Sequence, residues 1–224
     1  MIYFRGCVAR EKLNNIAKST EKILKHAGID YKILDNETCC GSFLLRTGFA
    51  REAEEVMKNT LKEIGEEKII TSCAGCYKTF KKDYKEILGV ELNVMHTSQL
   101  FNDLIKMGKV EPMFLDKTVT YHDPCHLGRH LEEYDAAREI LDNITNLVEM
   151  GRNKEKSRCC GAGGGVRAAF PDITENIAKM RIKEAEDVEA EILVTSCPFC
   201  ILNLKSVSND GKKIMDLSEI IMLK

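Results

Sequence analysis

Ten cysteines fall into two sets of five that share one order and almost one spacing. The metal-ligand candidates of the first set are Cys7, Cys39, Cys40, Cys73 and Cys76, and those of the second set are Cys125, Cys159, Cys160, Cys197 and Cys200. Corresponding cysteines lie 118 residues apart at the first position, 120 at the adjacent pair and 124 at the C-x-x-C motif. Adjacent cysteines can pair with each other only through a strained ring, so a bound metal explains them better. The sequence therefore predicts a duplicated five-thiolate site.

The composition favours metal binding or redox work by these thiols over structural disulfides. Hydrophobic residues make up 44% and charged residues 30% of the chain, as in ordinary globular proteins, and the formal charge of −2 gives no general attraction to nucleic acid. The start, Met1-Ile-Tyr-Phe-Arg5, lacks the apolar core of a signal peptide, and no apolar stretch approaches the roughly 20 residues that span a bilayer. We therefore expect a reducing, cytoplasmic location, no membrane span, and attachment to a membrane only through a partner.

Strand and helix patterns alternate through the first half of the chain. The expected strands are residues 2–4, 31–34, 68–71 and 92–95, and the expected helices are residues 13–27, 50–64, 73–88 and 97–107. Such alternation implies right-handed crossovers and a parallel sheet. Each cysteine segment then follows the carboxyl end of a strand, which is the edge where open parallel sheets bind ligands.

The same order restarts after residues 108–116, which carry no periodicity and are expected to form a linker. The expected strands are residues 118–121, 146–149, 192–195 and 213–215; one helix spans residues 127–141, and others begin at Pro171 and Cys197. The segments Ile70-Thr-Ser-Cys-Ala-Gly-Cys76 and Val194-Thr-Ser-Cys-Pro-Phe-Cys200 are the same element. The prediction is an α/β fold of two pseudo-symmetric halves, residues 1–107 and 117–224, each a small Rossmann-like parallel sheet flanked by helices.

The residues alone leave the metal open. Each C-x-x-C motif begins an expected helix, where unpaired N–H groups favour thiolate over thiol. A structural zinc site needs four ligands and would leave one cysteine of each set unused. An iron–sulfur cluster with more than four thiolates is unusual, and the common ferredoxin run of cysteines is absent. A thioredoxin-like role for one C-x-x-C motif would ignore the other three cysteines of its set.

The complete cysteine pattern resembles the duplicated CCG, or cysteine-rich, domain of heterodisulfide reductases. The second half carries His122-Asp-Pro-Cys-His-Leu-Gly-Arg-His130, Cys159-Cys-Gly-Ala-Gly-Gly-Gly165 and Thr195-Ser-Cys-Pro-Phe-Cys200. These segments are especially similar to the catalytic B subunit of those enzymes and to the C-terminal part of their D subunit. The resemblance covers essentially the whole chain.

This resemblance implies one non-cubane [4Fe-4S] cluster in each half, held by the five cysteines of that half, with zinc in one half as the less favoured alternative. It implies an anionic small-molecule disulfide, the CoB–CoM heterodisulfide, lying between the clusters, with sulfurs that bind iron as the S–S bond breaks. No ferredoxin-like segment precedes the first half, so we expect a ferredoxin-like iron–sulfur subunit as electron donor. Iron–sulfur subunits of lactate, glycolate and succinate oxidoreductases share the fold, so a role in electron relay alone stays open.

The glycines after the second cysteine pair are candidates for contacts with the substrate. Gly163, Gly164 and Gly165 would let backbone N–H groups approach a cluster or substrate, and the alternative is a flexible turn. A dinucleotide-binding loop is disfavoured, because Val166 stands where its last glycine should be. We expect valine at Gly164 to block the substrate without loss of iron.

Histidine and arginine side chains near the second set are further candidates. His126 and His122 could donate a proton to a leaving thiolate, although packing roles are common for such residues. Arg129 and Arg167 could bind an anionic substrate, and the alternative is a solvated helix face. The first cysteine pair is followed instead by the bulky run Ser42-Phe-Leu-Leu45. The second site is therefore expected to be more closely tied to the substrate.

Overall fold

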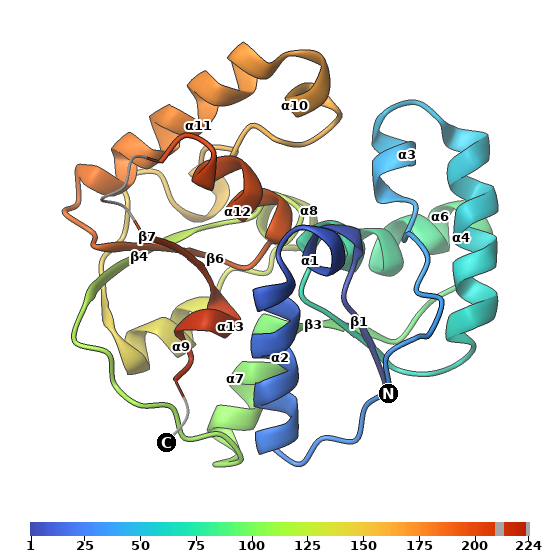
Figure 1. Cartoon of the computed structure of the whole chain (residues 1–224), viewed down its shortest axis with the longest axis horizontal. Coiled ribbons are helices and arrows are strands. Elements are labelled where there is room, and N and C mark those ends of the chain that lie inside the picture. Colours follow the sequence, from blue (N-terminus) through green and yellow to red (C-terminus); the bar gives the residue numbers. More distant parts are fainter. Residues whose placement is uncertain (209–212, 223–224) are drawn as a thin grey trace.

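Two small parallel sheets form the centre of the fold in the computed structural model, which describes residues 1–208 and 213–222 (Figure 1). The first sheet has the strand order β1-β2-β3, the second has the order β5-β4-β6-β7, and all these strand pairs are parallel. The strands are β1 (Ile2–Phe4), β2 (Ile69–Thr71), β3 (Val94–His96), β4 (Thr118–His122), β5 (Asn146–Leu147), β6 (Ile192–Thr195) and β7 (Lys213–Asp216). The predicted α/β fold of two pseudo-symmetric halves is confirmed.

Helices flank both sheets. In the first half they are α1 (Cys7–Glu11), α2 (Asn14–His26), α3 (Ser42–Arg46), α4 (Ala50–Ile64), α5 (Ala74–Lys78), the π-helical segment η1 (Thr79–Asp83), α6 (Tyr84–Leu88) and α7 (Thr97–Lys106). In the second half they are α8 (Gly128–Leu131), α9 (Ala136–Ile144), the 3₁₀ turn η2 (Lys154–Lys156), α10 (Val166–Ala169), α11 (Pro171–Glu186), α12 (Pro198–Lys205) and α13 (Leu217–Ile220). Within the described ranges, none of these helices has the length and apolar character needed to cross a membrane.

Strands β1 and β2 of the first sheet hold residues equivalent to those of β4 and β6 in the second. Tyr3 is paired with Ile70 in the first sheet, and Tyr121 is paired with Val194 in the second. On the side away from β2, a single bridge joins β1 to Lys32. In the second half, β5 occupies the equivalent place beside β4. The order of the equivalent segments is therefore the same in both halves. Each half brings its cysteine segments to the carboxyl edge of its own sheet.

Apolar packing joins the two halves. One hydrophobic cluster includes Phe4 and Leu193, and the other includes Tyr3 and Val194, so each cluster draws on both sheets. Neighbouring strand residues enter different clusters because side chains alternate between the two faces of a sheet. Helix α2 lies beside α13, and α7 lies beside α9 (Figure 1). These contacts fix how the two cysteine sets face each other.

The predicted linker, residues 108–116, leads from α7 to β4 without forming a helix or a strand. The domain boundaries themselves, residues 1–107 and 117–224, stay a prediction. The second range includes residues 209–212 and 223–224, which lie outside the described part of the chain.

The predicted strand at residues 31–34 is wrong. Within this segment only Lys32 forms a bridge, through hydrogen bonds of 2.9 Å from the Tyr3 N–H and 3.0 Å to the Met1 carbonyl. The segment lies at the sheet edge, where a neighbour on one side alone supplies hydrogen-bond partners. The corresponding strand of the second half, β5, also covers only Asn146–Leu147 of the predicted residues 146–149.

The predicted single helix over residues 127–141 is wrong as well. Helix α8 ends at Leu131, its C-cap residue Glu132 has the left-handed φ of 60°, and α9 begins at Ala136. Tyr134 folds back over Gly128, where an added Cβ would clash with the tyrosine ring. The apolar periodicity of the segment does not reveal this break, because the break depends on one left-handed residue and one close contact.

Candidate metal centre

All ten cysteines line one cavity, which has about 870 Å³ of empty space, part of it open to solvent. Every cysteine is a free thiol. Other lining residues come from both halves, including Ser42, Phe43 and Arg46 of α3 and His126, Gly163 and Gly164 of the second half. The duplicated cysteine sets predicted from the sequence therefore meet in a single site.

The carboxyl ends of the parallel strands place the cysteines at this cavity. Cys7 follows β1 and Cys125 follows β4. Cys73 follows β2 and is the N-cap residue of α5, and Cys197 follows β6 and is the N-cap residue of α12. Parallel strands end at one edge of their sheet, so residues far apart in the sequence are brought together there.

The thiols of the first set form one hydrogen-bonded group. Hydrogen bonds from the thiols of Cys40 and Cys7 lower the pKa of Cys39 to about 2. The Gly41 N–H also donates to the Cys39 sulfur, at 3.4 Å. The same contacts raise the pKa of Cys7, mainly through its hydrogen bond to Cys39, and burial adds to this rise. These contacts favour the thiolate form of Cys39 and the protonated form of Cys7.

The second set repeats this arrangement. Hydrogen bonds from the thiols of Cys125 and Cys160 lower the pKa of Cys159. The Gly161 N–H donates to the Cys159 sulfur at 3.3 Å. The hydrogen bond to Cys159 raises the pKa of Cys125, and burial raises it further. A cation bound at either set would replace the shared protons, since metal ligation requires thiolates.

The two sets touch each other through their C-x-x-C motifs. A hydrogen bond with Cys197 is the largest cause that raises the pKa of Cys73, to about 12. In turn, hydrogen bonds from Cys200 and Cys73 lower the pKa of Cys197. A group held by one set would therefore lie beside a group held by the other.

The glycine after each cysteine pair is required by close packing. Gly41 has φ of 87°, and an added Cβ would lie 2.8 Å from the Met57 side chain. Gly161 has φ of 92°, and an added Cβ would lie 3.0 Å from the Thr174 carbonyl oxygen. Left-handed φ values and this lack of space both exclude other residues. The Cys-Cys-Gly sequence thus folds the pair tightly against α4 in one half and α11 in the other.

His126 lies in the wall of the cavity, next to Cys125. Burial lowers the pKa of His126 to about 4, so its imidazole is neutral near pH 7 in this structure. Its ring packs against that of His130 at an interplanar angle of 48°, with centroids 5.0 Å apart. Burial also lowers the pKa of His130, and the positive charges of Lys78 and Arg46 add to that effect. Of the two predicted catalytic histidines, His126 is the one that lines the cavity.

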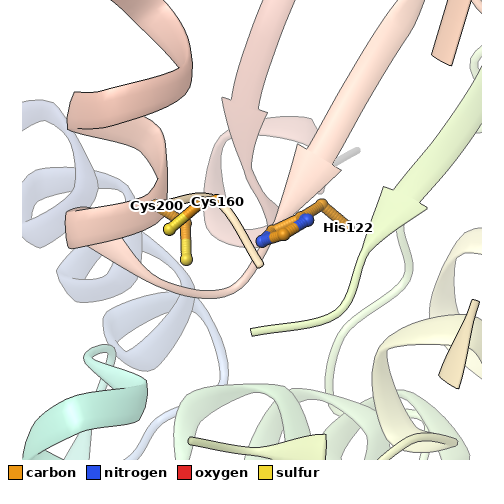
Figure 2. A group of neighbouring side chains, drawn as sticks. All are labelled: His122, Cys160 and Cys200. Carbon is orange, nitrogen blue, oxygen red and sulfur yellow. The ribbon is translucent and has the colours of Figure 1, made fainter. Parts of the chain in front are cut away.

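His122, the other candidate, lies behind the second cysteine set. Figure 2 shows its ring pointing toward the sulfur atoms of Cys160 and Cys200. One ring nitrogen and the two sulfurs all lie within 4.8 Å of one another, close enough for a shared metal ion. The side chain is only 1% exposed, and burial lowers its pKa to about 3. His122 therefore faces the sulfurs of Cys160 and Cys200 and not the open cavity.

The glycine run contributes two residues to the cavity wall, Gly163 and Gly164. Gly165 faces α3 instead, where an added Cβ would lie 3.0 Å from the Thr47 methyl group. Gly164 has φ of 63°, so valine there would combine added bulk with backbone strain. The structure offers Gly163 as the cleaner position for a steric test, because its φ is ordinary and its Cβ direction is open.

The two predicted arginines are hydrogen-bonded away from the cavity. Arg129 donates to the Ser157 carbonyl, and Arg167 donates to the Asn203 side chain. Neither lines the cavity, and their role in substrate binding stays a prediction. The cation in the cavity wall is Arg46, which sequence reasoning missed. Arg46 stands in the first half at the position of Arg167, so the repeat itself carried this signal.

Arg46 belongs to a small charged group at the cavity. Its guanidinium donates to one Asp83 oxygen at 2.7 Å, and the buried Lys78 ammonium donates to the other. One carboxylate thus faces two cations, which leaves a net positive charge. Asp83 closes the π-helical segment η1, a distortion that often marks functional sites. This side of the cavity favours an anionic ligand.

The chain matches a known protein family. The cysteine-rich domain family designated CCG matches residues 1–81 and again residues 119–205. The two matches contain all ten cysteines between them.

Three relatives are similar over nearly the whole chain. The D subunit of dihydromethanophenazine:CoB–CoM heterodisulfide reductase from Methanosarcina acetivorans is 41% identical over 235 residues, with 100% of this chain and 58% of the relative covered. The B subunit of fumarate reductase (CoM/CoB) from Methanothermobacter marburgensis is 35% identical, with 98% and 45% covered. An iron–sulfur protein of Methanococcus maripaludis is 38% identical, with 91% and 40% covered. The chain therefore spans about half the length of the relatives that it matches.

Proposed function

The chain belongs to the CCG cysteine-rich domain family, and from this premise we propose that it is the disulfide-reducing part of a heterodisulfide-reductase-type enzyme. Each half would hold one non-cubane [4Fe-4S] cluster. The CoB–CoM heterodisulfide, the compound in the name of the Methanosarcina relative, is the proposed substrate. The supporting observation is that two complete sets of five thiols face one open cavity and touch through Cys73 and Cys197.

The residues of each set fit an iron–sulfur cluster. Five sulfurs converge on each half of the cavity, and the N–H groups of Gly41 and Gly161 already donate to one sulfur of each set. A tetrahedral zinc ion would use four ligands and leave one thiol of each set without a role. The donor set therefore favours clusters over zinc.

Bound clusters would supply two electrons and iron atoms that can bind the sulfurs of the substrate. Reduction of one disulfide consumes two electrons and two protons and yields two thiols, so a donor protein must deliver the electrons. The chain's own contribution is binding and proton handling. Arg46 would hold an anionic group of the substrate, and His126, in the cavity wall, would hydrogen-bond a leaving thiolate and pass it a proton from solvent.

The proposed activity is tested with anaerobically prepared, iron-loaded chain, a reduced viologen dye as artificial donor, and the CoB–CoM heterodisulfide. We expect dye oxidation only when the disulfide is present, with two electrons used and two thiols formed for each disulfide. Both quantities are measured, by dye absorbance and by a thiol assay.

The same assay tests the partner. With a reduced, freely diffusing ferredoxin as donor and no second subunit, we expect turnover to be slow. The proposed donor is instead a ferredoxin-like iron–sulfur subunit that docks close to one cluster. Rapid ferredoxin-driven turnover by the chain alone would contradict the need for that subunit. Iron-loaded chain that leaves the dye reduced in the presence of the heterodisulfide would contradict disulfide reduction itself.

Valine at Gly163 is expected to block the substrate and to preserve the clusters. The added side chain would project from the cavity wall, where Gly163 has open space and ordinary backbone angles. We expect iron content to be unchanged and disulfide reduction with the viologen donor to fall at least about tenfold, since misplacing a substrate by about 1 Å already costs roughly a hundredfold in rate.

Gly151→Val is the matched control, because Gly151 is exposed, has equally open space and lies away from the cavity. It should retain full activity. Unchanged activity of Gly163→Val with full iron would show that the glycine run is only a turn.

The similarity to the fumarate reductase (CoM/CoB) relative supports a second candidate, an electron-relay subunit. In that role the clusters would carry electrons between partner subunits without binding a disulfide. The heterodisulfide assay separates the two candidates, because a relay subunit accepts electrons from the dye but does not pass them to the disulfide.

A further inference from the structure

A buried arginine and histidine lie directly behind the second cysteine set. The Arg181 Nε–H donates to His122 Nδ1 at 3.0 Å. The other ring nitrogen, Nε2, is buried and has no hydrogen-bond partner in the described residues. The His122 ring points toward the sulfurs of Cys160 and Cys200 (Figure 2). A buried, unpartnered polar atom aimed at a ligand set calls for an explanation.

Arg181 is itself held in place from several directions. It is fully buried in α11 and donates to the Arg152 carbonyl at 2.8 Å. It also donates to the Ser157 hydroxyl at 3.2 Å and pairs with Glu184 at 2.7 Å. Ser157 stands just before the loop of the second cysteine pair. The guanidinium therefore cannot turn away from His122 without breaking these bonds.

The contact with Arg181 decides which nitrogen of His122 carries the proton. A guanidinium only donates hydrogen bonds, so Nδ1 must accept and cannot carry a hydrogen in the neutral ring. The hydrogen of a neutral imidazole then sits on Nε2. His122 consequently presents an N–H group, in a fixed direction, to the two sulfurs.

The first half lacks this pair. Strand β1 places Phe4, which is paired with Thr71, where β4 of the second half places His122, which is paired with Thr195. Phe4 packs edge-on against Phe80, with ring centroids 4.9 Å apart. The arginine is missing as well. The buried residues of α4 (Ala53, Met57, Thr60 and Ile64) each lie 121 residues before buried residues of α11 (Thr174, Ala178, Arg181 and Ala185). Thr60 thus stands in place of Arg181.

We propose that Arg181 is a positioning residue that holds His122 as a fixed N–H donor to the sulfurs of Cys160 and Cys200, and that this donor raises the reduction potential of the second cluster. The inference rests on the proposed function, because it assumes a cluster in the second half. A hydrogen bond to a ligand sulfur stabilises the more negative, reduced form of a cluster. The imidazole acts on the second cluster alone, because the matching residue in the first half is Phe4.

Potentiometric titration of the iron-loaded chain, followed by EPR, tests this proposal. The signal of the second cluster is identified as the one that Cys160→Ser removes. His122→Phe, which installs the residue of the first half, should keep the iron and lower the potential of that signal. We expect about a tenfold change in its reduction equilibrium, equivalent to about 59 mV for a one-electron couple. The signal of the first cluster should not move.

Two further variants separate positioning from packing. Arg181→Met should lower the same potential in part, because His122 is then free to change tautomer. Arg158→Met is the matched control, because Arg158 pairs with the same Glu184 at 3.0 Å and makes no bond to His122. His122→Gln retains an N–H donor and should restore most of the potential lost in His122→Phe.

ENDOR of reduced protein carrying ¹⁵N-histidine distinguishes a hydrogen bond from direct ligation. We expect a weak ¹⁵N coupling and an exchangeable proton at the second cluster. A strong coupling, with loss of iron in His122→Gln, would show that His122 is an iron ligand and would overturn the proposal. Full iron with an unchanged potential in His122→Phe would overturn it too and leave the proposed function intact. A wild-type chain that takes up no iron would overturn both.

Discussion

Serine at Cys160 is expected to remove about half of the bound iron and sulfide and all disulfide cleavage. Cys160 is 4% exposed and lies among Cys159, Cys200 and the His122 ring, so a serine hydroxyl would put a poor iron ligand at the centre of the second set. The first set is built from other strands, so it should still assemble. Because the substrate is proposed to lie between the two clusters, one remaining cluster should not support turnover.

Iron and sulfide analysis, EPR and the viologen assay measure these three effects. Cys40→Ser is the matched variant of the first half, since Cys40 is equally buried and occupies the equivalent position. It should remove the other EPR signal and the activity. Full iron content in either variant would exclude that cysteine as a ligand. Substantial disulfide cleavage by Cys160→Ser would place the chemistry at the first cluster alone.

Protein prepared without oxygen should contain about eight irons and eight sulfides per chain, because ten cysteines line the cavity in two equivalent sets. The exposed cysteine of the first set tests whether a cluster needs all five thiolates. Cys7 is exposed, yet its thiol is hydrogen-bonded to Cys39 within the first set. If all five thiolates hold a cluster, Cys7→Ser should lower the iron content. If four thiolates suffice, the content should stay full.

Metal analysis by mass spectrometry and an acid-labile sulfide assay provide the measurement. The control is wild-type chain prepared in air with a chelator, which should contain little iron. Protein made without oxygen that contains only zinc, or a single four-iron cluster when fully loaded, would contradict the two-cluster proposal.

The sequence predicted the local features of this protein well. The alternation of apolar segments marked the main strands and helices, because each buries a stripe or face with its own period. The role of the glycine after each cysteine pair became visible only in the structure, where Gly41 and Gly161 have left-handed φ values and no room for a Cβ. Cysteines after strand ends were expected at one edge of a sheet, and all ten line one cavity.

Features that depend on one backbone angle or one close contact could not be predicted from the apolar periodicity of the sequence. The left-handed Glu132 breaks the helix predicted over residues 127–141, and Lys32 alone bridges to β1 where a strand was expected. Apolar periodicity averages over several residues, so it does not register a single turn or the length of an edge strand.

Contacts between the halves were decided by the tertiary structure alone. The Cys73–Cys197 hydrogen bond joins residues more than a hundred positions apart. Arg46 lines the cavity while its counterpart Arg167 is bonded to Asn203, although the repeat makes the two positions equivalent. The sequence alone determined which residues form each thiolate set and which strand ends hold them, because that information is local and repeated. Only the packing of one half on the other decided which side chains face the cavity and which, like His122 and Arg181, stand behind it, because side-chain direction depends on neighbours distant in the chain.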